Sequence, residues 1–202
     1  MTVCGILVAA GRGERFGGLK HAALLRDRPL WEWGRDALLH GGVSRVVLVG
    51  DLPGGVPGGV RRRDSVRAGL EALPRTASHV LVHDAARPLA TPDLVRRVID
   101  RLLAGGVDAV VPVVAVRDTL KRVGDGWVVH TVDRGDLAAA QTPQGFKVAV
   151  LRAAHGHDDD DAGDDAVLVE RMGGSVATVE GEASNLKITY PGDLALAEAW
   201  LP

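Results

Sequence analysis

The sequence lacks the features that mark secreted, membrane-spanning and disulfide-stabilised proteins. It contains one cysteine, Cys4, so no disulfide can form within the chain. It has no apolar run of about 18 residues, the length that a membrane-spanning helix needs. Its first residues carry no basic stretch of the kind that opens a signal peptide. We therefore expect no membrane span and a cytoplasmic protein.

Aromatic residues and excess positive charge are also scarce. Aromatics make up 3% of the chain while hydrophobic residues make up 46%, so the core is expected to be aliphatic, with Cys4 inside it. The formal net charge of -2 offers no basic excess for nucleic acid or an anionic membrane surface. A length of 202 residues suits one domain, so we predict a single domain over residues 1–202 that does not bind nucleic acid.

Four short aliphatic runs are the predicted strands. They cover residues 3–8, 44–49, 79–83 and 108–114. Each run is largely apolar instead of alternating with polar residues, as in strands covered on both faces.

Helical patterns lie between these runs. One is expected from Pro29 to the stop signal at Gly41, a second is expected to be capped by Asp64 or Ser65, and a third opens at Thr91. A last helix is expected from Pro191. The alternation of strand and helix predicts an α/β protein with a Rossmann-like, doubly wound, mostly parallel sheet.

Two segments depart from this pattern. Residues 115–136 hold two β-rich runs around Gly124-Asp125-Gly126, which predicts a protruding β-hairpin arm. Because a lone hairpin is marginal in water, the arm is expected to pack on its own domain or to hook onto another subunit. Residues 155–161 combine histidines with aspartates; a metal site is one interpretation, and a solvated acidic loop before a helix is the favoured one.

A glycine-rich turn follows the first predicted strand. Gly11 and Gly13 allow backbone N–H groups to approach a phosphate chain. A dinucleotide-binding fingerprint would place its third glycine where Phe16 stands, so the spacing disfavours a nicotinamide-dependent oxidoreductase. The turn also carries three cations, which favour transfer at a triphosphate over hydride transfer: Arg12, Arg15 and Lys20.

The ordered set of motifs resembles the 2-C-methyl-D-erythritol 4-phosphate cytidylyltransferases of the non-mevalonate isoprenoid pathway. The similarity covers nearly the whole chain, and HDAARP with TVDR and TPQ is its most specific part. The motifs are AAGRGERFGGLK (9–20), RDSVRAGL (63–70), VLVHDAARP (80–88), VRDTLKR (116–122), HTVDR (130–134), QTPQGF (141–146), DDAVLVE (164–170) and NLKIT (185–189).

The resemblance implies a role for each matching position. Arg15 and Lys20 are expected to stabilise the transition state at the α-phosphorus of CTP. Arg134 and Lys187 are expected to hold the incoming polyol phosphate, with Thr119 and Thr142 as further contacts on that substrate's side. The nucleotide is expected to meet Ala9, Ala10, Gly11, Gly13, Gly59, Ser65 and Asp84.

The resemblance also implies a cofactor and a partner. Family members use Mg²⁺, for which Asp84 is the expected ligand, and are usually homodimers in which the arm of one subunit completes the site of the other. No general base is expected, because the second pKa of a phosphate monoester is about 6 and the attacking group is already charged at neutral pH.

Three departures from the family pattern leave alternatives open. Arg15 and Lys20 are only five residues apart, Leu19 replaces the usual proline, and Val60 stands where an acid is common. The short loop resembles that of molybdenum-cofactor nucleotidyltransferases. A cytidylyltransferase for another polyol phosphate, such as ribitol 5-phosphate, is the alternative function, and a nucleotide-binding regulator without activity is the non-enzymatic one.

Overall fold

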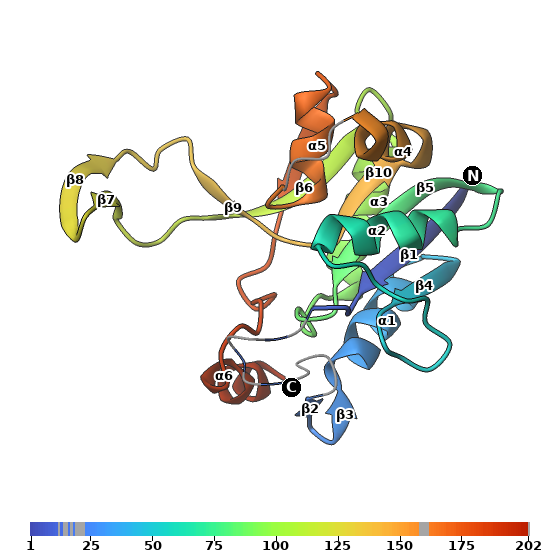
Figure 1. Cartoon of the computed structure of the whole chain (residues 1–202), viewed down its shortest axis with the longest axis horizontal. Coiled ribbons are helices and arrows are strands. Elements are labelled where there is room, and N and C mark those ends of the chain that lie inside the picture. Colours follow the sequence, from blue (N-terminus) through green and yellow to red (C-terminus); the bar gives the residue numbers. More distant parts are fainter. Residues whose placement is uncertain (12, 14–15, 17, 19–22, 158–161, 202) are drawn as a thin grey trace.

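A mixed seven-stranded sheet forms the centre of the molecule (Figure 1). The computed structural model describes the chain except at positions 12, 14–15, 17, 19–22, 158–161 and 202. The sheet order is β11-β6-β10-β5-β1-β4, and β9 pairs with β6. The strands are β1 (Thr2–Val8), β4 (Arg45–Val49), β5 (Ala77–Asp84), β6 (Ala109–Ala115), β9 (Ala138–Ala140), β10 (Gln144–Lys147) and β11 (Val176–Glu180).

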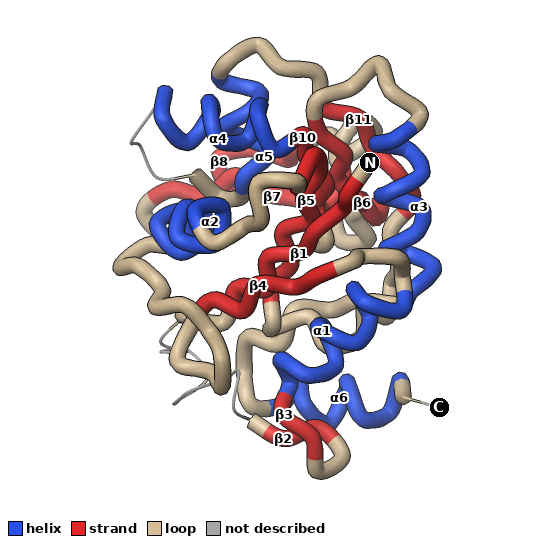
Figure 2. Tube along the Cα trace, turned by 90° about the vertical axis from the view of Figure 1, so that its right-hand side faces the viewer, coloured by secondary structure: helices blue, strands red, loops and turns tan. Residues whose placement is uncertain are grey.

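Helices cover both faces of this sheet, so the predicted doubly wound α/β fold is confirmed (Figure 2). Helices α1 (Leu30–His40) and α3 (Pro92–Leu103) pack on one face. Helices α2 (Arg62–Glu71), α4 (Val148–His157) and α5 (Asp165–Arg171) pack on the other. Both interfaces are almost entirely aliphatic, and Cys4 lies in one of them with no exposed surface, as predicted.

The helix signals in the sequence were largely right. The side chain of Thr91 accepts the N–H of Leu94 at 3.1 Å and caps α3. The expected start of α2 at Asp64 or Ser65 is wrong, because the helix begins at Arg62. Asp64 instead occupies the third helical position and accepts the backbone N–H of Arg61 at 3.1 Å, the reverse half of a capping box.

The second half of the chain holds elements that the sequence did not reveal. Strand β10 runs antiparallel between β5 and β6, and β9 also runs antiparallel to β6, so the sheet is mostly but not wholly parallel. Helix α4 and strand β11 were also missed, whereas α5 is the helix expected after the acidic loop. The expected solvated loop at 155–161 is wrong at its start, because residues 155–157 end α4 and His155 is buried.

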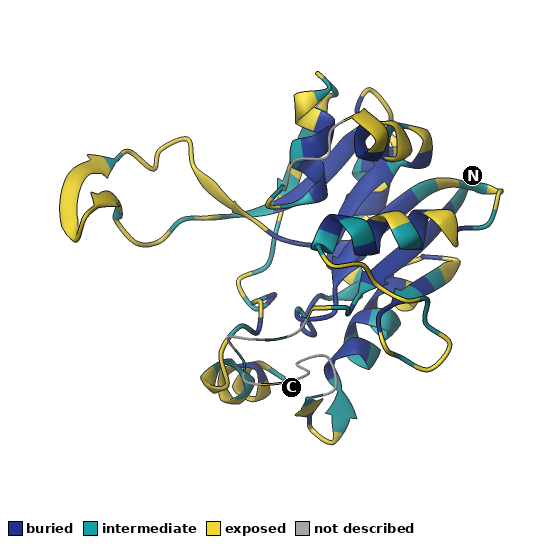
Figure 3. Ribbon diagram, in the orientation of Figure 1, coloured by how far each residue is buried: buried dark blue, intermediate teal, exposed yellow. Residues whose placement is uncertain are grey.

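The predicted hairpin arm is confirmed and projects away from the sheet (Figures 1 and 3). Strands β7 (Leu120–Gly124) and β8 (Trp127–Val132) pair antiparallel across the turn at Asp125 and Gly126. Both turn residues have positive φ, 49° and 82°, which matches the twist that two-residue hairpins require. Nearly every arm residue is exposed, so within one chain the arm has no surface to lie on.

A small apolar cluster below the sheet supports the loop that precedes the last helix. It joins the ribbon β2 (Leu24–Leu25) and β3 (Arg28–Pro29) to α6 (Gly192–Trp200), with the fully buried Ile188 at its centre. The N–H of Ile188 donates to the carbonyl of Ala86 at 2.8 Å, which fixes the neighbouring Lys187 beside the end of β5. Among the described residues, no helix has the length and apolar character needed to cross a bilayer.

Candidate functional site

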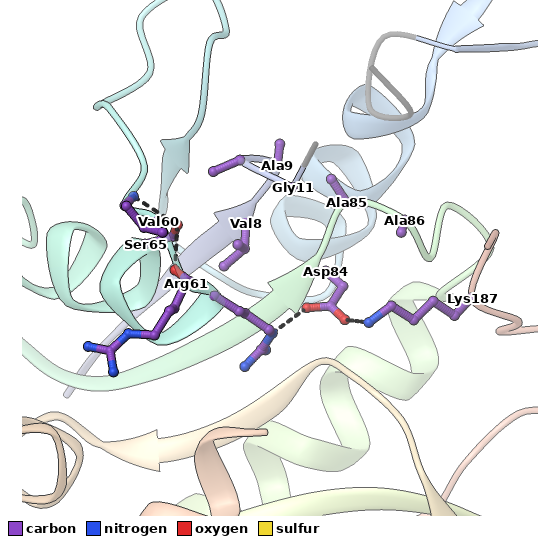
Figure 4. Close-up of a pocket in the computed structure, with 13 residues that line it drawn as sticks. Val8, Ala9, Gly11, Val60, Arg61, Ser65, Asp84, Ala85, Ala86 and Lys187 are labelled. Carbon is purple, nitrogen blue, oxygen red and sulfur yellow. Dashed lines mark hydrogen bonds and ion pairs between the residues drawn. The ribbon is translucent and has the colours of Figure 1, made fainter. Parts of the chain in front are cut away.

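A pocket opens where the parallel strands β1 and β5 end and α2 begins (Figure 4). The carboxyl edge of an open α/β sheet is where such folds bind ligands. The pocket brings together four stretches that lie far apart in the sequence: residues 8–11, residues 59–62 with Ser65, residues 84–86, and Lys187. Seven of the predicted site residues line it: Ala9, Ala10, Gly11, Gly59, Ser65, Asp84 and Lys187.

Close packing shapes the wall of the pocket beside α2. A methyl group added at Gly58 would lie 2.1 Å from the side chain of Ala10, so only glycine fits there. The hydroxyl oxygen of Ser65 accepts the N–H of Gly59 at 3.0 Å, and the hydroxyl donates to the carbonyl of Arg61 at 3.3 Å. Ser65 thus holds the glycine loop against the helix, while both residues still face the pocket.

A chain of charged side chains crosses the floor of the pocket. One carboxylate oxygen of Asp84 accepts Nε of Arg62 at 3.0 Å and the other accepts Nζ of Lys187 at 2.7 Å (Figure 4). Nη1 of Arg62 also donates to Asp165 at 2.6 Å, and Asp165 accepts Nε2 of His155 at 3.1 Å. Burial raises the pKa of Asp84, but the charges of Arg62 and Lys187 outweigh it and hold that pKa below its usual range.

Thr142 and His83 lie beneath the pocket and fix the position of Asp84. The hydroxyl oxygen of Thr142 accepts the backbone N–H of Asp84 at 3.1 Å and lies 2.9 Å from Nδ1 of His83. Nε2 of His83 donates to the carbonyl of Arg87 at 3.1 Å. Burial lowers the pKa of His83 to about 4, so at neutral pH the ring is neutral and Nδ1 accepts the hydroxyl proton of Thr142. His83 is structural, and the substrate contact assigned to Thr142 stays a prediction.

Buried amides fasten the Lys187 loop to the same strand edge. Asn185 has no exposed surface, and its side chain donates to the carbonyl of Thr142 at 2.9 Å. Nη1 of Arg87 donates to the carbonyl of Asn185 at 2.7 Å. These bonds hold Lys187 at the pocket on a segment without regular secondary structure.

Two predicted substrate-binding residues lie on the arm, away from this pocket. Thr119 and Arg134 are exposed at the base of the hairpin. The guanidinium of Arg134 donates to the carbonyls of Val116 and Arg117. One copy of the chain therefore does not bring Arg134 to Lys187.

Three further predicted site residues belong to the glycine-rich turn: Gly13, Arg15 and Lys20. Arg15 and Lys20 lie outside the described residues, so their roles stay predictions. Gly13 is described, has a positive φ of 64°, and is not among the residues that line the pocket.

The capacity of the site for a metal ion depends on Asp84. Within the described ranges, no three His, Cys, Asp or Glu side chains gather closely enough to form a metal cage. Asp84 is the one carboxylate among the described residues that line the pocket. Mg²⁺ usually binds through one or two carboxylates together with substrate phosphates, so Asp84 fits that mode and does not fit an all-protein cage.

Two arginines of the pocket were not predicted from the sequence. Arg61 and Arg62 line the pocket, but the nearest motif, RDSVRAGL, begins at Arg63. The run of three arginines before Asp64 was the available signal, and only the structure distinguishes their roles. Arg63, for example, is buried and reaches the carbonyl of His155 instead of the pocket.

We expect the stability of the protein to fall as the pH drops from about 6.5 to about 4. The pKa of buried His83 is depressed to about 4, so over this range the unfolded chain binds a proton that the folded chain does not. Below about pH 4 the pKa-depressed pair Asp84 and Asp165 adds to the loss, because their ionised forms stabilise the fold. Urea unfolding across pH 4–7.5 measures the effect.

A His83→Gln variant should show a flatter curve between the two pH limits than the wild type. His130→Gln, which replaces an exposed imidazole on the arm, should follow the wild-type curve. Parallel curves for the wild type and His83→Gln would show that His83 is not the group responsible.

Comparison with known proteins agrees with the fold and the pocket. A glycine-rich turn and a cation-lined pocket at the carboxyl edge of a doubly wound sheet place the chain among the α/β proteins whose ligands bind at that edge. Residues 3–202 match the family model described as "IspD: 2-C-methyl-D-erythritol 4-phosphate cytidylyltransferase". The chain belongs to this family.

Individual relatives support the assignment along nearly the whole chain. The chain is 45% identical to the 2-C-methyl-D-erythritol 4-phosphate cytidylyltransferase of Frankia casuarinae, with 98% of this chain and 81% of that one covered. It is 38% identical to the crystal structure of the Thermus thermophilus protein of that name, with a TM-score of 0.82 and 96% of both chains covered.

Some relatives are longer than this chain. The chain is 44% identical to a protein of Solidesulfovibrio magneticus named "Bifunctional enzyme IspD/IspF". The match covers 100% of this chain and 58% of that protein, so the chain spans a little over half of the bifunctional relative.

Proposed function

We propose that the protein transfers the cytidylyl group of CTP to the phosphate of 2-C-methyl-D-erythritol 4-phosphate. The products are 4-diphosphocytidyl-2-C-methyl-D-erythritol and pyrophosphate. The observation that carries the proposal is the single pocket that joins the turn after β1, the glycine loop before α2, Asp84 and Lys187. Membership of the cytidylyltransferase family supports the same conclusion.

The two ends of the pocket suit the two parts of a nucleotide. The cytosine is expected beside Gly59 and Ser65, where backbone groups and a hydroxyl line a tightly packed wall. The ribose and the α-phosphate are expected toward Asp84, next to Ala9, Ala10 and Gly11. Gly13, Arg15 and Lys20 would then follow the triphosphate along the rest of the turn.

The reaction needs charge neutralisation more than acid–base catalysis. An oxygen of the polyol phosphate attacks the α-phosphorus of CTP, a new P–O bond forms, and the bond to the leaving pyrophosphate breaks. Because the attacking phosphate is already an anion, the barrier lies in bringing two anions together. Lys187 supplies positive charge beside Asp84, and we assign Arg15 and Lys20 to the α-phosphorus.

Mg²⁺ is the proposed cofactor. When bound, it would neutralise triphosphate charge and help pyrophosphate to leave. Asp84 would hold it together with phosphate oxygens, since the carboxylate lies in the pocket and is kept ionised by its two cationic neighbours. Arg62 and Lys187 then orient that carboxylate from either side.

We further propose a cytoplasmic homodimer. The arm exposes a cluster of large apolar side chains, with Trp127 79% and Val129 62% exposed. Exposed apolar surface of this kind is typical of protein contacts. In a two-fold dimer the arm of each copy would carry Thr119, Arg134 and their neighbours to the pocket of the other, next to Lys187. The buried, unpaired Cys4 suits a reducing compartment.

A matrix of nucleoside triphosphates against polyol phosphates, read by pyrophosphate release with Mg²⁺, tests the function. The proposal predicts the highest kcat/KM for CTP with 2-C-methyl-D-erythritol 4-phosphate. A preference for ribitol 5-phosphate would overturn the choice of acceptor. If no nucleoside triphosphate releases pyrophosphate with either polyol phosphate, the proposed activity is wrong.

A further inference from the structure

A buried pair of side chains lies behind the pocket and reaches it through Arg62. Asp165 is the first residue of α5 and is 1% exposed, and the side chain of His155 near the end of α4 is 3% exposed. Neither lines the pocket. The two helices that carry them pack against each other, and α4 also packs against α2, which carries Arg62.

The contacts form an unbroken line from this pair into the pocket. Nε2 of His155 lies 3.1 Å from Oδ1 of Asp165, and Oδ2 of Asp165 lies 2.6 Å from Nη1 of Arg62. Nε of Arg62 in turn lies 3.0 Å from Oδ1 of Asp84. Since the Asp165 carboxylate can only accept, the ring of His155 donates from Nε2.

This arrangement fixes a guanidinium at two separate points. A single ion pair would leave Arg62 free to turn about its own side chain, whereas two carboxylates on different edges of its planar group hold it in one orientation. Asp165 also balances the charge. With Asp165 the cluster holds two carboxylates against Arg62 and Lys187, and without it the two cations would share Asp84 alone.

We infer that Asp165, held by His155, is a positioning residue that acts through Arg62 to set the orientation of Asp84 in the nucleotide pocket. Asp165 touches no ligand in this account. Asp165 on α5 holds Arg62, and Arg62 in turn holds Asp84 at the end of β5. The inference rests on the proposed function for its assay, because it concerns how the pocket receives CTP.

The neighbouring Asp164 offers a matched control. It caps the same helix by accepting the N–H of Val167 at 3.1 Å and it also accepts Nε2 of Gln144 at 2.7 Å. No contact joins it to Arg62 among the described residues. Asn is as good a helix cap as Asp, so Asp164→Asn makes the same chemical change one residue away and keeps the helix start.

The test is a double-mutant cycle on kcat/KM for CTP, with Arg62→Gln, Asp165→Asn and the double variant. We expect Asp165→Asn to lower kcat/KM for CTP about tenfold, mainly through KM, which corresponds to one charge-assisted hydrogen bond. In the Arg62→Gln background the same change should have almost no further effect. Asp164→Asn should behave as the wild type.

The cycle also separates positioning from stability. Each variant is assayed at a temperature at which its unfolding curve shows it folded. His155→Gln, which keeps a donor toward Asp165, should retain nearly wild-type KM, while His155→Leu should raise KM in the same direction as Asp165→Asn. Equal losses from Asp165→Asn in both backgrounds, or no loss in the wild-type background, would overturn the inference.

The two proposals fail in different measurements. If the wild type releases no pyrophosphate, the proposed function fails, and the same cycle is then run on the dissociation constant of CTP measured by calorimetry. If the wild type neither turns over nor binds CTP, the nucleotide pocket itself is wrong and the inference falls with it. If the wild type is active and the cycle is additive, only the inference fails.

Discussion

Lys187→Ala is expected to lower kcat/KM about 10²–10³-fold, the usual cost of removing one group that stabilises charge in a transition state. The ammonium lies 2.7 Å from Asp84 and lines the pocket, and the proposed reaction brings the attacking phosphate to this side. Its loss leaves the two anions less neutralised. Initial rates of pyrophosphate release, with either substrate varied, measure the change.

Lys147→Ala is the matched control for this substitution. Lys147 also pairs with an aspartate, Asp108, at 3.0 Å, and its side chain is 40% exposed against 42% for Lys187. It lies at the end of β10, outside the pocket. We expect Lys147→Ala to keep wild-type rates. Wild-type rates in Lys187→Ala as well would remove Lys187 from the reaction and move the acceptor site elsewhere.

Replacing Trp127 and Val129 together by serine is expected to convert the proposed dimer into a monomer and to abolish most of the turnover. Both side chains lie on β8 and are among the most exposed large apolar groups of the arm. If the arm docks on a second copy, removing its exposed apolar groups removes the contact that brings Arg134 to the other pocket. Light scattering gives the mass, and pyrophosphate release gives the activity.

Leu39→Ser controls for the loss of exposed apolar surface as such. Leu39 is 42% exposed and lies on α1, which is not part of the hairpin. We expect this variant to remain a dimer with full turnover. A wild type that is already a monomer and fully active would contradict the proposed exchange of arms.

The sequence predicted the first half of the fold better than the second. Strands β1, β4, β5 and β6 and the cap of α3 could be predicted because their signals are local: apolar runs, a capping threonine, paired glycines. Strand β10 escaped because four residues with one large apolar side chain carry no period. Its place in the sheet depends on pairing with both β5 and β6.

The candidate site was also predicted in part. The motifs predicted seven of the residues that line the pocket, including Asp84 and Lys187, although 103 residues separate these two. The motifs did not predict the contact of Arg62 with Asp165, also 103 residues apart, because it depends on the packing of α2 against the α4–α5 layer. His155 looked like part of an acidic loop, and only its burial against Asp165 shows otherwise.

The central proposal is that Lys187 at the sheet edge of one copy and Arg134 on the arm of another act at the same site. There they neutralise the phosphates of CTP and of the polyol phosphate. Mixing the separately inactive variants Arg134→Ala and Lys187→Ala tests this directly. Random exchange of subunits makes half of the dimers mixed, each with one intact pocket of two, so we predict recovery of about a quarter of wild-type turnover. No recovery after verified exchange would show that the arm and the sheet edge do not share a site.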